Sequence, residues 1–263
     1  MPDVQEPKIY LQQNQPEGVP PLALTGERTL PDVPEENYWY RRHLVVYEWI
    51  RERVGGLKVI DMACGEGYGS GVLGGVAREV VGVDANPEAF AHASARYTVP
   101  GRVRFARDLV ETFDEPADAV VFLQTIEHVQ NPDEILERFK TLVSGSPSPV
   151  VIVSTPNLLT LAPEGAEKSE NPWHVKEYRP EEFLALCRNH FGTVEMYGLF
   201  HARRLAVHEL AIKKLGWDAI HKALRITKPF YDRFTPAISA RDFVLDRDRS
   251  LDGALDFVAV CRP

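Results

Sequence analysis

The chain has 263 residues, of which 44% are hydrophobic and 26% are charged, a composition typical of a globular protein with a sizeable core. Its formal net charge of −8 argues against a broad nucleic-acid surface, because such a surface needs clustered lysine and arginine. No apolar run approaches the length of a membrane span, and the first residues lack the basic and apolar stretches of a signal peptide.

The first predicted helix follows an N-terminal segment that we expect to be a tail. Residues 1–34 are rich in Pro, Gln and Glu, and we expect them to form a flexible tail. From residue 35 the sequence ENYWYRRHLVVYEWIRERV places apolar and aromatic residues at helical spacing, which predicts a helix ending at Gly55 and Gly56. We expect residues 35–263 to form a single domain.

Strand-like and helix-like segments then alternate, which predicts parallel βαβ units in one doubly wound α/β sheet. The expected strands are residues 57–63, 79–85, 102–108, 118–124, 149–156, 193–200 and 254–263. The expected helices are residues 68–77, 87–97, 132–143 and 180–189. Residues 201–253 form a mostly helical insertion that is too long for an ordinary connection, and we expect it to act as a lid.

A glycine-rich loop, VIDMACGEGYGS (residues 59–70), follows the first predicted strand. Such loops often bind phosphate through backbone N–H groups. Here Asp61 and Glu66 would oppose a phosphate, and the lysine of a P-loop is absent. The loop is therefore typical of a ligand that is cationic at this point, such as S-adenosylmethionine, which carries an ammonium and a sulfonium.

Two acids at later strand ends extend this pattern. Asp84 ends the second strand and can accept hydrogen bonds from both ribose hydroxyls, a role that suits NAD equally well. Asp108 ends the third strand and can accept a hydrogen bond from the adenine amino group, while the Leu109 amide can reach a ring nitrogen. Because open α/β sheets bind ligands at the carboxyl ends of their strands, these residues predict a nucleoside site there.

The segments VIDMACGEG, VGVDANP, FARDL and FLQTIEHVQNP resemble, in order, the motifs of class I S-adenosylmethionine-dependent methyltransferases. The resemblance spans residues 57–200 and implies a Rossmann-like seven-stranded sheet with an antiparallel last strand. It departs from the family at Ala63, where the usual motif has its first glycine, although alanine is small enough for the cofactor. The resemblance assigns cofactor binding to Asp61, Ala63, Cys64, Gly65, Gly67, Tyr68, Asp84, Ala85, Asp108, Leu109 and Gln124.

A narrower resemblance covers nearly the whole chain. The segments LTGERTLPD, ENYWYRRH, STPN, NPWHVKE, GLFH and DRSLDGALDFVAVCRP are similar to a group of actinobacterial sugar O-methyltransferases. Mycobacterial members of that group are associated with polymethylated polysaccharides, notably 6-O-methylglucose lipopolysaccharide. This resemblance implies that the methyl acceptor is a hydroxyl of a sugar or oligosaccharide.

A sugar hydroxyl is a poor nucleophile until its proton is removed, so a base is expected beside the acceptor. His128 follows the fourth strand and is the first candidate, with Glu127 to orient it; alternatively it caps the next helix or packs beside the cofactor. His174 is the second candidate, or belongs to a loop that is merely well hydrogen-bonded. These three residues could also bind Mg, Mn or Zn, but their spacing is not diagnostic, and the sequence predicts no metal.

Other residues are expected around the cofactor and the acceptor. Arg42 can hold the cofactor carboxylate through paired donors, or can belong to an amphipathic helix packed on the sheet. The residues expected on the acceptor side are Tyr38, His43, Asn157, Glu177, Tyr178 and His201.

The leading hypothesis is a cytoplasmic sugar O-methyltransferase, with reduced cysteines and no nucleic-acid partner. The first rival is a methyltransferase of secondary metabolism with a phenol or amine acceptor. The second is an NAD-dependent oxidoreductase or epimerase, against which Glu66 and the lack of a Y-x-x-x-K pair argue. The third is a non-catalytic cofactor-binding regulator, which would need neither candidate base. Homodimerisation through the insertion is favoured.

Overall fold

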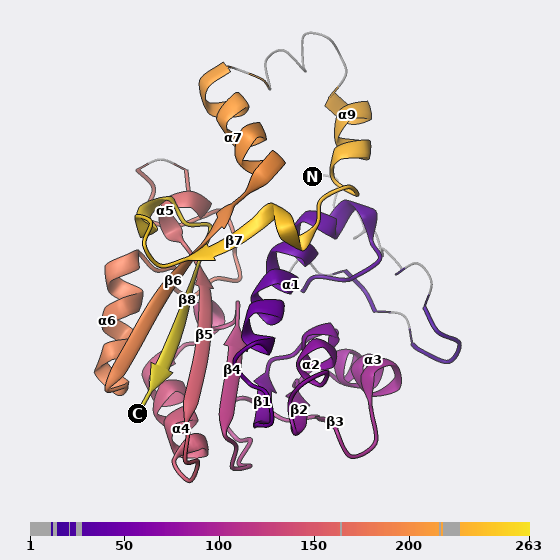
Figure 1. Cartoon of the computed structure of the whole chain (residues 1–263), viewed down its shortest axis with the longest axis vertical. Coiled ribbons are helices and arrows are strands. Elements are labelled where there is room, and N and C mark those ends of the chain that lie inside the picture. Colours follow the sequence, from indigo (N-terminus) through magenta and orange to yellow (C-terminus); the bar gives the residue numbers. More distant parts are fainter. Residues whose placement is uncertain are drawn as a thin grey trace, which may run out of the picture.

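A computed structural model describes residues 12, 15–20, 22–24, 28–163, 165–215, 217 and 227–263. An eight-stranded sheet with the order β3-β2-β1-β4-β5-β8-β6-β7 forms its centre (Figure 1). The strands are β1 (Lys58–Met62), β2 (Glu79–Val83), β3 (Val103–Ala106), β4 (Ala119–Leu123), β5 (Val150–Pro156), β6 (Thr193–His201), β7 (Phe243–Asp246) and β8 (Asp256–Arg262). This confirms the predicted α/β class.

Strands β1 to β5 are parallel and form the half of the sheet that carries the glycine-rich loop. Their sequences are nearly continuous apolar runs, and every residue of β5 is buried, as expected for strands covered on both faces. Because the strands run in the same direction, the loops after β1, β2, β4 and β5 meet at one edge of the sheet.

The sheet has eight strands, one more than the seven expected, and the additional strand lies in its other half. Strand β8 lies antiparallel between β5 and β6, as the predicted antiparallel last strand requires. Strand β7 is an additional strand, which pairs antiparallel with β6 and lies inside the segment expected to be mostly helical. Its addition covers the free edge of β6, whose unpaired backbone groups would otherwise invite pairing with another chain.

The helices cover both faces of the sheet (Figure 1). They are α1 (Asn37–Arg51), α2 (Tyr68–Leu73), α3 (Pro87–Tyr97), α4 (Pro132–Val143), α5 (Leu158–Leu161), α6 (Pro180–His190), α7 (Arg203–Leu215) and α9 (Thr227–Phe234). Short 3-10 turns lie at η1 (Pro34–Glu36), η2 (Ile126–His128), η3 (Ala240–Asp242) and η4 (Leu251–Gly253). One core joins α4 and α6 to the sheet, and a second joins α1 and α2 to the opposite face.

Helices α3 and α4 begin where their sequences predict. Asn86 precedes Pro87, and its side-chain oxygen accepts hydrogen bonds from the Glu88 and Ala89 amides at 2.9 Å. This caps the amides that lack a partner in the first turn of α3. Pro132 likewise stands at the start of α4, where its missing N–H costs nothing.

The described part of residues 1–34 packs on the domain, which differs from the flexible tail expected. Leu22 and Leu30 are fully buried, and Val33 joins them in a small apolar cluster. Gln12 donates a hydrogen bond to Glu66 at 2.7 Å. Leu22 and Leu30 therefore belong to the packed fold, because their apolar surface is removed from water.

Helices α7 and α9 stand together beyond one end of the sheet (Figure 1). Asn37, at the start of α1, donates hydrogen bonds to the carbonyls of Thr235 and Ile238, which fixes the chain after α9. Part of the expected lid, residues 216 and 218–226, lies outside the described residues. Within the described ranges, no helix combines the length and the hydrophobicity that crossing a membrane requires.

Candidate functional site

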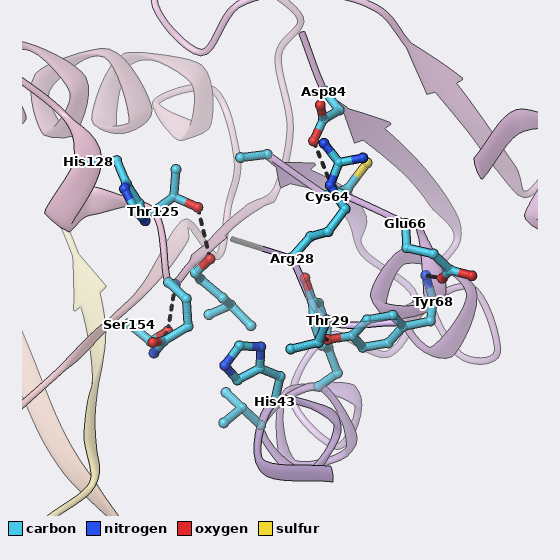
Figure 2. A pocket seen from close by; sticks show the side chains of 16 residues that line it. Arg28, Thr29, His43, Cys64, Glu66, Tyr68, Asp84, Thr125, His128 and Ser154 are labelled. Carbon is cyan, nitrogen blue, oxygen red and sulfur yellow. Dashed lines mark hydrogen bonds between the residues drawn. The ribbon is translucent and has the colours of Figure 1, made fainter. Parts of the chain in front are cut away.

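A cavity of about 290 Å³ lies at the carboxyl ends of β1 and β4. In Figure 2 side chains surround it from three sides: α1, the loop after β1 and the turn after β4. The predicted site residues in its wall are His43, Ala63, Cys64, Gly65, Tyr68, Asp84, Gln124 and His128. Eight residues chosen from the sequence are thus brought together by the fold.

The loop after β1 wraps through left-handed backbone conformations. Ala63, Gly65 and Gly67 have φ values of 55°, 56° and 95°. A Cβ on Gly67 would lie 2.7 Å from the Cβ of Ala93, so only glycine fits there, and its role is packing against α3. Ala63 holds the left-handed conformation that glycine adopts more easily, at a cost of about 1 kcal/mol. Alanine is therefore accommodated, at a small cost.

Asp84 closes the loop onto the end of β2. Its carboxylate accepts hydrogen bonds from the amides of Gly65 at 2.8 Å and Asn86 at 2.9 Å. These two contacts hold the carboxylate at the cavity wall, where the predicted ribose contact requires it. Ala85, the next residue, is exposed and is not among the described residues that line the cavity.

Asp61 lies behind the cavity rather than in its wall. Its fully buried carboxylate accepts hydrogen bonds from the hydroxyls of Ser70 at 2.7 Å and Tyr47 at 3.1 Å. Burial disfavours the charged form and raises the pKa of Asp61 to about 7. Asp61 therefore ties the loop to α1 and α2.

We expect this buried carboxyl to make the free energy of unfolding fall as the pH rises. The pKa of Asp61 is about 7 in the folded protein and about 3.9 in an unfolded chain, so the folded form holds the extra proton. The stabilisation that this extra proton gives the folded form is fully present below about pH 4. It is lost as the pH rises through 7. The free energy of unfolding, measured with urea between pH 4 and 8, should fall more steeply for the wild type than for Asp61→Asn. Parallel curves for the two proteins would contradict this assignment.

The Glu66 carboxylate is not the unpaired charge that the glycine-rich loop was expected to present to a ligand. Its buried carboxylate accepts hydrogen bonds from Gln12, from Arg96 at 3.1 Å and from the Tyr97 hydroxyl, and lies 2.9 Å from the ring of His92. Figure 2 shows its side chain turned away from the centre of the cavity. The negative charge of Glu66, which was expected to oppose a phosphate at the cavity, is therefore paired with Arg96 inside the fold.

Asp108 and Leu109 form a turn of their own after β3. The Asp108 carboxylate accepts hydrogen bonds from the Leu109 amide at 2.8 Å and the Thr112 hydroxyl at 2.6 Å, and these bonds lower its pKa. Neither residue is among the described residues lining the cavity, and Leu109 is 53% exposed. The Asp108 carboxylate and the Leu109 amide are therefore not positioned in the cavity wall, where the predicted contacts with adenine would require them.

Arg42 forms an ion pair inside the protein instead of lining the cavity. Its guanidinium forms a buried ion pair with Asp256 through contacts of 2.7 and 2.5 Å, and donates a third hydrogen bond to the Leu255 carbonyl. Arg42 is not among the described residues that line the cavity. The side chain of Arg42 thus joins α1 to β8, away from the cavity in which it was expected to hold the cofactor carboxylate.

Four of the residues expected on the acceptor side lie elsewhere. Tyr38 and His201 line a second cavity of about 390 Å³ near α7 and α9, where the Tyr38 hydroxyl lies 2.8 Å from His201 Nε2. Asn157 is buried, and its amide donates to carbonyls in and beside η4. Tyr178 is fully buried, and its hydroxyl has no hydrogen-bond partner among the described residues. The side chains of Asn157 and Tyr178 are thus held inside the fold, and neither is among the described residues lining the first cavity.

His43 does reach the first cavity, from α1 (Figure 2). Burial lowers its pKa to about 4, so its imidazole is neutral at pH 7. A neutral ring in the wall can exchange hydrogen bonds with a ligand without adding charge.

The candidate catalytic residues form a cluster at the rim of the cavity. Glu127 and His128 lie in η2, after β4, and the ring of His128 stands 4.9 Å from that of His174, measured between centroids. His174 is buried, and its Nδ1 lies 2.6 Å from the Glu177 carboxylate. Ligating atoms of Glu127, His128 and His174 all lie within 4.8 Å of one another. The fold therefore joins the TIEHV and NPWHVKEY motifs.

Arg28 and Thr29 are among the cavity residues that the sequence analysis did not select. Arg28 and Thr29 reach the cavity from the segment before α1, and the Thr29 hydroxyl lies 2.9 Å from that of Tyr68 (Figure 2). Their segment, LTGERTLPD, was recognised only as part of a resemblance. Arg28 brings paired donors of the kind that suit a carboxylate, the role expected of Arg42.

Comparison with known proteins extends these observations. The family described as "Methyltransferase domain" matches residues 38–210. A probable S-adenosylmethionine-dependent methyltransferase of Mycobacterium tuberculosis is 34% identical over 248 residues, covering 91% of this chain and 89% of the relative. A ubiquinone biosynthesis O-methyltransferase of Leptothrix cholodnii is 31% identical over 160 residues, covering 54% of this chain and 67% of the relative.

Among solved structures, the fold is similar to that of an S-adenosylmethionine-dependent methyltransferase from Thermotoga maritima described as a possible histamine N-methyltransferase. The TM-score is 0.58 at 14% identity, and the match covers 87% of this chain and 94% of the other. At this identity the similarity concerns the fold alone.

Proposed function

This chain belongs to the class I S-adenosylmethionine-dependent methyltransferases, and we propose that it methylates a hydroxyl of a sugar or oligosaccharide. Membership makes the protein an enzyme with S-adenosylmethionine as its cofactor, which confirms that part of the sequence prediction. The proposal concerns the acceptor and the residues that act on it.

The cavity fits the cofactor in the chemistry of its wall. The Asp84 carboxylate can accept hydrogen bonds from ribose hydroxyls, and Arg28 can hold the carboxylate of the amino-acid portion. Val46 and Leu123 supply apolar surface between these polar groups. When bound, S-adenosylmethionine supplies a methyl group carried on a positively charged sulfur.

The observation that carries the proposal is the cluster of Glu127, His128 and His174 at the rim of this cavity. Loss of the acceptor's proton makes a hydroxyl nucleophilic, and an imidazole within reach can assist that loss. His128 is the member of the cluster that lines the cavity. We assign to it the removal of the acceptor proton, either directly or through a group that the cluster binds.

An exposed tryptophan supports a sugar as the acceptor. Trp173 is 62% exposed, although large aromatic side chains usually bury most of their surface. Its carbonyl lies 3.1 Å from Nδ1 of His128, so the residue is directly beside the cluster. The flat face of an indole suits the C–H face of a pyranose ring, which would seat the sugar with a hydroxyl towards His128.

We expect Trp173→Ala to raise the KM for a saccharide acceptor about fivefold and to change kcat less than threefold, because stacking on an aromatic ring is worth about 1 kcal/mol. Initial rates at saturating S-adenosylmethionine would measure both constants. Trp39→Ala provides a matched control, since Trp39 is also exposed but lines the second cavity. An unchanged KM would remove this support for a sugar acceptor.

The second candidate is a small aromatic acceptor. The name of one relative, a ubiquinone biosynthesis O-methyltransferase, specifies transfer to oxygen, which a phenol would satisfy and an amine would not. The His128 cluster suits a phenol as well as a sugar hydroxyl, since both must lose a proton.

Transfer of label from radioactive S-adenosylmethionine tests the proposal. The acceptors are oligosaccharides based on glucose and mannose, with phenols and amines as rivals. Label in a saccharide that is lost in His128→Ala is the result expected. Label in a phenol or an amine, with none in any saccharide, would overturn the sugar assignment.

A further inference from the structure

We propose that Glu127, His128 and His174 bind one divalent transition-metal cation of the zinc class. The first argument is the donor set, since two imidazoles and one carboxylate, two of them buried, converge from separate segments. Two histidines and a glutamate form a known set of protein ligands for catalytic zinc, with a further position left for water or substrate.

The hydrogen bonds of His174 fix which of its nitrogens would bind the cation. Its Nδ1 lies 2.6 Å from the Glu177 carboxylate, which can only accept, so Nδ1 carries the proton. Its Nε2 therefore bears the lone pair and accepts a hydrogen bond from the Asn171 amide at 3.0 Å. A cation would replace only this single neutral donor.

His128 has the same arrangement. Its Nδ1 lies 3.1 Å from the carbonyl of Trp173, again an acceptor, so the lone pair of the neutral ring is on Nε2. Histidines that ligate a metal almost always donate their other N–H to a carboxylate or a carbonyl, which fixes the tautomer and orients the ring. Glu177 and Trp173 supply one acceptor of each kind.

The two segments that carry the ligands are locked together. The carbonyl of Glu127 accepts hydrogen bonds from the amides of Val175 at 2.8 Å and Lys176 at 3.1 Å. The Glu127 carboxylate accepts one hydrogen bond from the Thr155 hydroxyl at 3.1 Å. A site whose supporting contacts are made before the ligand arrives loses little entropy on binding.

The ligand types select the class of cation. Imidazole suits zinc and its transition-metal neighbours, whereas Mg²⁺ and Ca²⁺ prefer oxygen ligands. The role of the cation rests on the proposed function: it would polarise the acceptor hydroxyl at the cavity rim and lower its pKa. With His128 as a ligand, the proton of the acceptor hydroxyl would pass to solvent water at the cavity rim, so His128 would assist its loss through the cation.

The test uses Co²⁺ as a spectroscopic substitute for Zn²⁺. We expect the full chain to bind one equivalent, to show visible absorption typical of nitrogen and oxygen ligands, and to lose that absorption when Zn²⁺ is added. Replacing His128, His174 or Glu127 by glutamine should weaken Co²⁺ binding at least 100-fold. Glu177→Gln, which removes only a supporting carboxylate, should weaken it about 10- to 100-fold.

His190→Gln is the matched control, because His190 also contacts two carboxylates, those of Asp133 and Glu137, but lies on α6 away from the cluster. It should bind Co²⁺ like the wild type, and circular dichroism would confirm that each variant is folded. Failure of the wild type to bind one equivalent, or equal binding by the folded cluster variants, would overturn the proposal. Because binding is measured without methyl transfer, stoichiometric Co²⁺ with no methylated saccharide would instead count against the proposed function.

Discussion

Replacing His128 with alanine is expected to lower kcat by about 10²- to 10⁴-fold, the range in which positioned general acids and bases contribute. The physical reason is that the ring lies in the cavity wall after β4, where it can assist loss of the acceptor's proton. The loss should appear in kcat at saturating acceptor and cofactor, because the proton transfer is made in the transition state.

Two controls separate chemistry from binding. The affinity of His128→Ala for S-adenosylhomocysteine, measured by calorimetry, should stay within about threefold of the wild type, a difference under 1 kcal/mol. His190→Ala, outside the cavity, should retain full kcat. A kcat for His128→Ala within threefold of the wild type would return His128 to the alternative role of packing beside the cofactor.

Replacing Arg42 with alanine is expected to lower the free energy of unfolding by about 3–5 kcal/mol. The change would leave the Asp256 carboxylate, which is 1% exposed, as an uncompensated buried charge. Desolvation of such a charge costs far more than an exposed ion pair contributes. Urea denaturation followed by circular dichroism would measure the loss.

The matched control is Arg41→Ala, because Arg41 is adjacent on α1 and, within the described part of the chain, donates a single hydrogen bond, to Asn37. It should cost less than about 1 kcal/mol. The double variant Arg42→Met with Asp256→Leu should recover most of the stability, since buried ion pairs can often be replaced by apolar residues. If Arg42→Ala instead kept its stability and lost affinity for S-adenosylmethionine, the cofactor role expected from the sequence would stand.

The sequence alone was sufficient for the parts of this protein that depend on local patterns. The alternation of strand-like and helix-like segments predicted the α/β class, and the expected ranges 87–97 and 132–143 matched the starts of α3 and α4. The positions of Asp84 and His128 followed from the rule that parallel strands end at the same edge. Both residues lie in the cavity wall.

Only the tertiary structure decided how charged side chains are paired. Arg42 and Asp256 are 214 residues apart in the chain, and they meet because β8 is inserted between β5 and β6. Glu66 is neutralised by partners from α3 and from the segment before α1. The sequence shows the charge of each residue, but burial and partners over such separations depend on strand order and packing. For the same reason Arg28, and not Arg42, reaches the cavity.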